Sequence, residues 1–343
     1  LVGPVLGFVQ PSSFLEQIAQ FGAIFLMFII GLNTKFDDLK KDVYRGSLLA
    51  LLGAALSFAA GFAVGYYFFN DVVVGLVLGV AIGSTSTVVS LRSLIDVGEF
   101  RTNLYHKITM VLTADDVVAI LALSLMTSYL TFGIVEIWKI LALFFAVLGF
   151  FFLILTAGSK FVPPTVDLFG RLKDEQMLLS IPLVILFLVA FASEQVGIAG
   201  VTGAFLAGMA MNKSPLAESV IAPKVKTIGY GFFIPLFFAY AALSLDLSFL
   251  VNNFNIILIL LVAASAAKFI GCGLASRIDG LKRREQIIVG VAMIPRGEYA
   301  IIVAQAVLGF AAASQQVYTI IVSFVLLSIL ITPLLLRIAH RLW

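Results

Sequence analysis

The sequence predicts an all-α polytopic membrane protein with an inverted repeat and two broken helices that cross. Three observations support this prediction: the composition, the regular spacing of apolar runs, and matching interruptions in two of those runs. Of the 343 residues, 61% are hydrophobic and only 12% are charged, whereas soluble domains carry ~25% charged residues. A water-soluble globule of this composition would expose much apolar surface, so we expect a chain embedded in a lipid bilayer.

Composition also excludes several other classes of protein. The mean hydropathy is +1.11. The single cysteine, Cys272, excludes a disulfide framework and a cysteine-based metal site. A net charge of +3 is too small to indicate a nucleic-acid partner, and we expect no cofactor. Leu1 is not a natural start and residues 1–9 look like the tail of an earlier span, so we expect further N-terminal helices.

Eleven apolar runs follow one another along the chain, each near the ~20 residues that cross ~30 Å of hydrocarbon as a helix. The runs are residues 13–34, 46–68, 75–91, 108–127, 134–157, 178–193, 197–211, 228–245, 254–276, 286–308 and 317–336. We therefore expect eleven spans.

Basic residues gather in every second connection between these runs. The basic connections are residues 35–45, 92–107, 158–177, 212–227, 277–285 and the tail after 336. Since Lys and Arg mark cytoplasmic loops, we expect the first span to start outside and the C-terminus to be cytoplasmic. The expected location is the cell (inner or plasma) membrane. Three basic residues do not follow this pattern: Lys139, near a membrane edge, and Lys268 and Arg296, inside spans.

Five charged residues lie within the predicted spans: Asp115, Asp116, Lys268, Arg296 and Glu298. A charged side chain at membrane depth costs at least ~2.5–3.5 kcal/mol, and such residues usually face a cavity or one another. The adjacent aspartates in TMVLTADDVVAI are the most unusual of the five. We therefore expect the functional site to be built around them, and we favour this over a pair of capping or loop aspartates.

The two aspartates cannot have the same surroundings, because neighbouring residues on a helix point ~100° apart. One can face a cavity while the other faces a packed partner. A carboxylate that titrates near neutral pH can hold either a proton or a metal cation, which is the minimum requirement for coupled exchange. Lys268, in AASAAKFIGCG, is the expected partner; snorkelling towards Arg277, ~13 Å along the helix, is the alternative.

The two ends of the chain contain mirrored triplets of spans. Residues 46–127 form a triplet that begins inside, and residues 254–336 form one that begins outside. The middle helix of each is interrupted, by GSTSTVVS at 83–90 and by MIPRGEY at 293–299. Inverted triplets with broken helices are typical of secondary transporters, whose ion site lies where the breaks cross.

The first break is rich in small hydroxyl residues, which can satisfy freed backbone groups and supply oxygen ligands to a cation; ordinary helix packing is the alternative. These residues are Ser84, Thr85, Ser86 and Thr87. In the second break, Pro295 removes a helix hydrogen bond. We expect Arg296 and Glu298 to neutralise half-helix dipole ends and each other, a structural role that we prefer to ion binding.

Several motifs occur in one order over almost the whole chain. They are LVGPVLGF, FGAIFLMFIIGL, GSTSTVV, TADDVVAI, FFIPLFFAYAALSLDL, AAKFIGC and IPRGEYAII. In these motifs the chain resembles the monovalent cation:proton antiporter family, specifically its NapA-type sodium/proton antiporters. The resemblance implies the inverted-repeat antiporter fold.

The resemblance also implies a homodimer with two domains in each protomer. Residues 1–34 and 178–245 would form the dimerisation or scaffold domain. Residues 46–127 and 254–336 would form the core ion-translocation domain, and 134–157 would be a linking helix.

Within the core, the resemblance implies that Asp116 binds Na⁺ or a proton in turn, so this carboxylate is the transient metal ligand. Asp115 would pair with Lys268, which would also carry a proton. Asn33 departs from the family, because relatives often have an acid there. Asp115 and Arg296 differ from the residues of potassium-efflux relatives, and this difference favours sodium.

We therefore expect a secondary active antiporter and not an enzyme. It would exchange Na⁺ (or Li⁺) for H⁺ by alternating access, electrogenically, and serve pH homeostasis. The main alternative is a K⁺/H⁺ antiporter on the same scaffold. An intramembrane aspartyl protease would need its carboxylates to face one another, and a cation channel would need a continuous pore. The expected partners are these ions, the lipid bilayer and a second copy of the chain.

Overall fold

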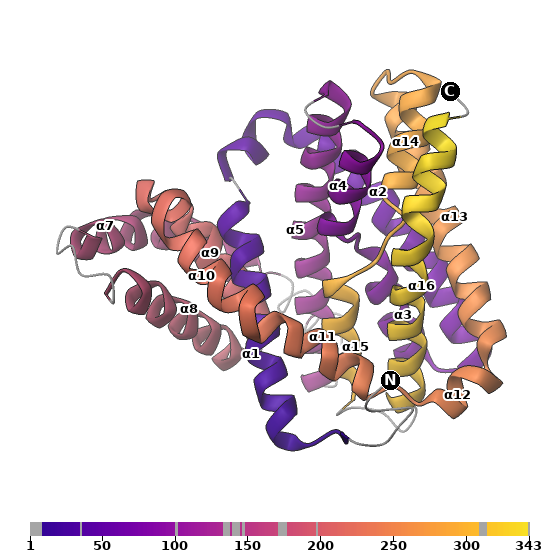
Figure 1. The fold of residues 1–343 in the computed structure, drawn as a ribbon, viewed down its shortest axis with the longest axis horizontal. Coiled ribbons are helices and arrows are strands. Elements are labelled where there is room, and N and C mark those ends of the chain that lie inside the picture. Colours follow the sequence, from indigo (N-terminus) through magenta and orange to yellow (C-terminus); the bar gives the residue numbers. More distant parts are fainter. Residues whose placement is uncertain are drawn as a thin grey trace. The chain divides into compact units, whose positions relative to one another are not determined.

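The computed structural model describes residues 9–34, 36–99, 102–132, 138, 145, 148–170, 177–196, 198–308 and 314–341. Within these ranges every regular element is a helix, which confirms the predicted class (Figure 1). The chain divides into two compact units. Unit 1 contains Leu1–Leu6, Asp38–Leu123 and Ser244–Trp343, and unit 2 contains Gly7–Asp37 and Ser124–Leu243.

Unit 1 contains the helices of both predicted triplets. They are α2 (Phe36–Phe69), α3 (Val72–Gly83), α4 (Thr87–Asp96), α5 (Asn103–Phe132, which continues into unit 2), α12 (Leu247–Asn252), α13 (Phe254–Ile278), α14 (Arg283–Ala292), α15 (Glu298–Val307) and α16 (Ser314–Arg341).

Unit 2 is built around α1 (Ser13–Asn33), which packs against α9 (Gly200–Met211). Its other helical segments are η1 (Ile154–Gly158), α7 (Ser159–Gly170), α8 (Met177–Gln195), η2 (Ala217–Ile221), α10 (Ala222–Ile228), η3 (Gly229–Phe233) and α11 (Ile234–Leu243). Phe25 stacks on Phe233 with ring centroids 4.9 Å apart, which joins α1 to η3.

Eight helices among the described residues are long and apolar enough to span a membrane, or nine if a bent pair at Leu148–Gly158 and Lys160–Val166 is one span. The shorter α9 and the interrupted pair α14 and α15 occupy two further predicted runs. Much of the predicted 134–157 helix lies outside the described residues. The run predicted at 197–211 begins instead at Gly200.

Both predicted interruptions are present, and they touch one another. The first separates α3 from α4 at residues 84–86, and the second separates α14 from α15 at residues 293–297. The amide of Ser86 donates a 2.8 Å hydrogen bond to the carbonyl of Pro295. A Cβ at Gly297 would lie 2.6 Å from the Ser86 hydroxyl, so this approach requires glycine.

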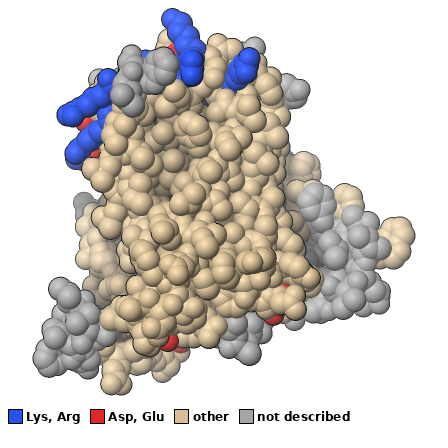
Figure 2. Space-filling model, turned by 90° about the vertical axis from the view of Figure 1, so that its right-hand side faces the viewer, with Lys and Arg blue, Asp and Glu red and all other residues tan. Residues whose placement is uncertain are grey.

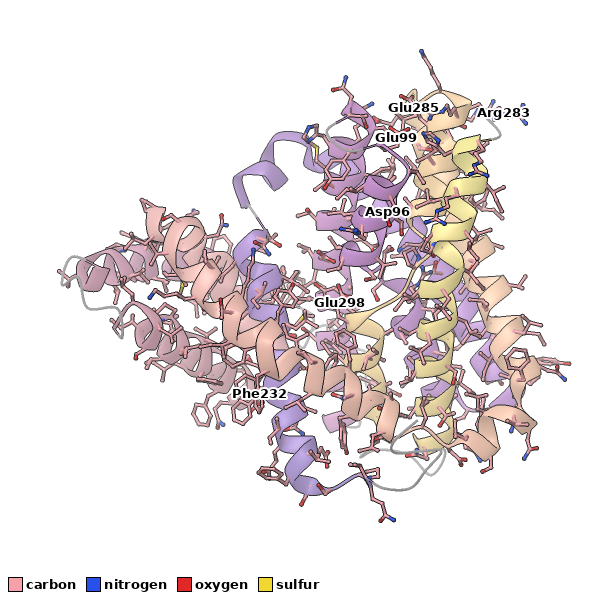
Figure 3. All side chains as sticks on the ribbon, in the orientation of Figure 1. Asp96, Glu99, Phe232, Arg283, Glu285 and Glu298 are labelled. Atoms are coloured by element: carbon pink, nitrogen blue, oxygen red, sulfur yellow. The ribbon has the colours of Figure 1, made fainter. Side chains whose placement is uncertain are left out.

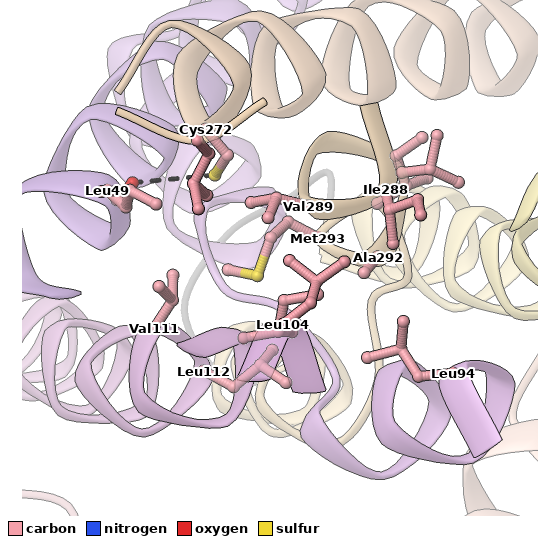
Figure 4. Packing of buried hydrophobic residues seen from close by; sticks show 14 of the residues in the cluster. Leu49, Leu94, Leu104, Val111, Leu112, Cys272, Ile288, Val289, Ala292 and Met293 are labelled. Carbon is pink, nitrogen blue, oxygen red and sulfur yellow. Dashed lines mark hydrogen bonds between the residues drawn. The ribbon is translucent and has the colours of Figure 1, made fainter. Parts of the chain in front are cut away.

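An apolar cluster holds the half-helices α4 and α14 against their neighbours (Figure 4). It includes Leu49 of α2, Leu94 of α4, Leu112 of α5, Cys272 of α13 and Ile288 of α14. In a membrane such contacts act through close packing, because lipid is as apolar as leucine. The cluster therefore holds the two short half-helices in a fixed position.

The Lys and Arg residues on the visible surface gather at one end of unit 1 (Figure 2). Figure 3 shows Glu99, Arg283 and Glu285 together at this end, far from Glu298 in the middle. Arg284 pairs with Glu99 at 3.0 Å. In Figure 2 the Lys and Arg residues gather at the same end, above a broad band in which the visible described residues are uncharged. Such a band is typical of a surface in contact with lipid.

Candidate functional site

Lys268 and Asp115 form an ion pair in the interior of unit 1. Lys268 Nζ of α13 lies 2.7 Å from Asp115 Oδ1 of α5, and the side chains are 0% and 1% exposed. The ammonium group also donates a 2.6 Å hydrogen bond to the carbonyl of Gly83 at the end of α3. The snorkelling alternative is therefore wrong, because Lys268 is buried and paired.

The second oxygen of Asp115 is also occupied, since Oδ2 accepts a 2.7 Å hydrogen bond from the amide of Thr85. A buried ion pair is tolerated only when its remaining hydrogen-bonding groups are satisfied. The pair thereby links α5, α13 and the first break into one polar centre.

Asp116 has different surroundings. Its two carboxylate oxygens share one donor, the hydroxyl of Thr87, at 3.1 and 3.2 Å. The residue is 3% exposed, and among the described residues no Lys or Arg lies within ion-pair distance of it. The ~100° offset between neighbours on a helix produces this difference between Asp115 and Asp116.

Two further oxygen groups lie close to Asp116. Glu298 is buried and accepts a 3.0 Å hydrogen bond from the Ser86 hydroxyl through Oε2, while Oε1 has no partner in the described part of the chain. Its carboxylate lies near enough to Asp116 for the two negative charges to repel each other. The buried hydroxyl of Tyr299 lies near Asp116, and among the described residues it makes no hydrogen bond of ordinary geometry. Hard cations prefer oxygen ligands of these kinds.

Tyr299 was not identified from the sequence. Its only signal is its position next to Glu298 in MIPRGEY. Tyrosine is common in membrane proteins at the level of the headgroups, so its type alone does not indicate a site.

The expected neutralisation of Arg296 by Glu298 is wrong, because no ion pair joins these two described residues within 4 Å. The Arg296 guanidinium instead donates to the carbonyls of Ile82 at 2.7 Å, Met293 at 3.0 Å and Ile294. Carbonyls at the ends of helices lack partners within the helix and carry the negative end of its dipole. Arg296 therefore caps the carboxyl ends of α3 and α14, and its planar fork can serve several carbonyls at once.

The remaining residues predicted for the breaks serve mainly to join them. The Thr85 hydroxyl donates to the carbonyl of Met293 at 3.3 Å, and Pro295 supplies the carbonyl that accepts from Ser86. The Ser84 hydroxyl stays with its own helix and donates to Ala81 at 3.5 Å. Ser90, which the sequence did not single out individually, donates to the carbonyl of Ala292 at 2.6 Å.

The chain matches a known protein family and several known proteins along most of its length. A family model described as sodium/hydrogen exchanger, transmembrane, matches residues 1–339. The chain is 31% identical over 338 residues to the Na⁺/H⁺-K⁺ antiporter GerN of Bacillus cereus, covering 98% of this chain and 86% of that protein. It is 29% identical over 332 residues to a Na⁺/H⁺ antiporter of Enterococcus hirae, covering 97% and 86%.

A solved structure has a similar fold. It is the sodium proton antiporter MjNhaP1 from Methanocaldococcus jannaschii, with a TM-score of 0.71 and 15% sequence identity. The match covers 99% of this chain and 89% of that one. At this identity the likeness concerns the fold alone.

Proposed function

Because the chain belongs to the sodium/hydrogen exchanger family, we propose that it is a secondary antiporter that exchanges Na⁺ or Li⁺ for H⁺ across the membrane. The observation that carries this proposal is Asp116: a buried carboxylate with one hydroxyl donor and no cationic partner among the described residues. A buried carboxylate without a counter-charge is strongly disfavoured. It needs either a proton or a cation, so the two compete for one position.

The surroundings of Asp116 suit a small hard cation. The Thr87 hydroxyl is within hydrogen-bonding distance of its carboxylate. Glu298 and Tyr299 each have a buried oxygen that no described residue hydrogen-bonds. Sodium entering this position would find oxygen ligands that would otherwise stay unsatisfied. The unpaired oxygens therefore support cation binding.

In the proposed cycle Lys268 carries a second proton. A cation arriving at Asp116 adds positive charge beside the Asp115–Lys268 pair and competes for its carboxylate. An ammonium group without a counter-charge is disfavoured in apolar surroundings, so Lys268 would release its proton. Two protons would then exchange for one sodium ion, and the membrane voltage would contribute ~2.3 kcal/mol per charge per 100 mV.

For alternating access we propose that residues 46–127 and 254–336 move as the core, while 1–34 and 178–245 form a dimerising scaffold joined through 134–157. The division into units supports a movement of bodies, which broken-helix transporters commonly use. Spin labels in units 1 and 2 should show a sodium-dependent change in their distance distribution. Unchanged distributions under active exchange would contradict a moving core.

We place the protein in the cell membrane, with its C-terminus in the cytoplasm. The basic residues at one end of unit 1 support this orientation (Figure 2). Lipid would cover the uncharged band, and a second copy would pack on the scaffold. Accessibility of a C-terminal tag to protease in intact cells would contradict the orientation.

Two alternatives have unequal support. Potassium exchange remains open, since one relative is named as a Na⁺/H⁺-K⁺ antiporter. An aspartyl protease lacks support, because Asp115 is occupied by Lys268 and the Thr85 amide and cannot share a substrate with Asp116.

Purified protein in liposomes, challenged in turn with Na⁺, Li⁺ and K⁺, tests the proposal. We expect Na⁺ and Li⁺ to drive proton movement; a response to K⁺ alone would establish the alternative, and no response to any of the three would contradict antiport.

A further inference from the structure

We propose that Gly53 of α2 is a positioning residue for Lys268. Because Gly53 has no side chain, the stem of the lysine can pass α2 and reach Asp115. This inference deepens the proposed function and rests on it for the transport role of Lys268. It concerns a residue outside the ion position proposed above.

The backbones of α2 and α13 meet at a pair of glycines. A Cβ added at Gly271 would lie 2.9 Å from the Cα of Gly53 and 2.9 Å from the carbonyl oxygen of Leu52. Small residues in membrane helices permit such close approach. The crossing point therefore lies within one turn of Lys268 on α13.

Lys268 and Cys272 are four residues apart on α13 and so lie on one face, and Gly53 is opposite both. A Cβ added at Gly53 would overlap the sulfur of Cys272 and lie 3.3 and 3.4 Å from Cδ and Cε of Lys268. An alanine at position 53 would thus collide with the sulfur of Cys272 and press on the lysine stem, which would have to shift by a few tenths of an ångström.

The lysine stem cannot readily move out of the way, because it is held at both ends. Its Cα belongs to α13, and its Nζ is held by Asp115 Oδ1 at 2.7 Å and by the carbonyl of Gly83 at 2.6 Å. A methyl group pressing on the middle of a stem that is held at both ends forces either a strained rotamer or a longer Nζ–oxygen distance. Gly53 therefore determines how far Lys268 reaches.

The sulfur of Cys272 makes a rescue experiment possible. Gly53→Ala alone should reduce exchange at least about tenfold, since it overpacks a close helix contact. Cys272→Ala removes the overlapping sulfur, so the double variant Gly53→Ala/Cys272→Ala leaves only the pressure on the lysine stem. Cys272→Ala alone is the reference, and Gly273→Ala on the same helix is the matched control, because a Cβ there meets nothing within 4 Å.

We expect both reference variants to exchange ions like the unmodified protein. The double variant should regain the melting temperature of Cys272→Ala, but its pH profile and its charge moved per sodium should shift towards those of Lys268→Gln. A purely structural role for Gly53 would restore all three quantities together. A double variant whose pH profile and charge per sodium equal those of Cys272→Ala, and whose Lys268 keeps both acceptors, overturns the inference.

A structure of the double variant separates this inference from the proposed function. We expect Lys268 Nζ to lose either Asp115 or the Gly83 carbonyl as an acceptor. A lysine that keeps both acceptors contradicts the positioning role, whatever the transport data show. If the lysine is displaced and transport is unchanged, Gly53 positions Lys268, and it is the proton-carrying role proposed above that fails.

Discussion

Lys268 Nζ lies 2.7 Å from Asp115 Oδ1 with both side chains buried. Asp116, the residue after Asp115, instead accepts from the Thr87 hydroxyl and has no cationic partner among the described residues. The pairing makes Asp115 the structural and electrostatic partner of Lys268. It leaves the Asp116 carboxylate available to bind a proton or a cation. This asymmetry between two adjacent residues is the basis of the predictions that follow.

Replacing Asp116 by asparagine should abolish exchange, since an amide cannot take up a proton or neutralise a cation. The change is nearly isosteric and removes a buried charge, so folding should be kept. Sodium-driven pH change in proteoliposomes, with thermal stability measured on the same preparation, checks both points. Asp96→Asn is the control, because Asp96 forms a surface pair with Arg92 and such pairs contribute little. Exchange near the unmodified rate in Asp116→Asn would remove Asp116 from the mechanism.

Lys268→Gln should leave exchange that is electroneutral and has a shifted pH profile. Glutamine keeps a polar group beside Asp115 but cannot carry a proton. Transient current on a supported membrane, compared with sodium-driven pH change in liposomes, gives charge per sodium. If the variant moves the same charge per sodium as the unmodified protein, the lysine is only a partner of Asp115.

Thr87→Val should weaken the apparent affinity for sodium at constant pH. The valine removes the hydroxyl that donates to both oxygens of Asp116 and offers no oxygen to a cation. A hydrogen bond to a charged group contributes ~1.5–3 kcal/mol, so the loss should be about tenfold or more. Thr113→Val on α5 is the matched control, because its hydroxyl donates to the carbonyl of Thr109 in its own helix. Equal sodium dependence in both variants would contradict a role for the Thr87 hydroxyl.

Arg296→Lys should destabilise the protein although the charge is kept. One ammonium group cannot reproduce the guanidinium bonds to Ile82, Met293 and Ile294. A buried acceptor left without a partner costs ~1–3 kcal/mol. We expect a lower melting temperature than for Arg277→Lys, an exposed site on α13. If Arg296 instead neutralised Glu298, then Glu298→Gln would destabilise the protein as much as Arg296→Lys, and we expect that it does not.

Asp246, between two spans, should make stability depend on acidity. Hydrogen bonds from the Ser248 hydroxyl and the Phe249 amide lower the pKa of Asp246 below 3.8. A lowered pKa stabilises the fold at pH above the unfolded value and ceases to do so as pH falls through the folded value. The melting-temperature difference from Asp246→Asn should therefore shrink between about pH 6 and pH 3. A constant difference over this range would contradict the prediction.

The sequence by itself determined the membrane class, the positions of the two breaks and the charged residues inside the spans. These features are visible without a structure because a charge or a break at membrane depth is costly, so it stands out against uniform apolar sequence. The family motifs extended this to the inverted-repeat fold and to the pairing expected of Asp115 with Lys268.

Only the tertiary structure decided which groups meet. Arg296 and Glu298 are two residues apart and of opposite charge, yet each has other partners, because the carbonyl ends of α3 and α14 converge on Arg296. Tyr299 and Gly53 have residue types that are common in membrane helices, so nothing in the sequence marks them. Their importance comes from α15 placing a hydroxyl near Asp116 and from α2 and α13 touching beside Lys268, and such contacts between distant segments exist only once the helices have packed.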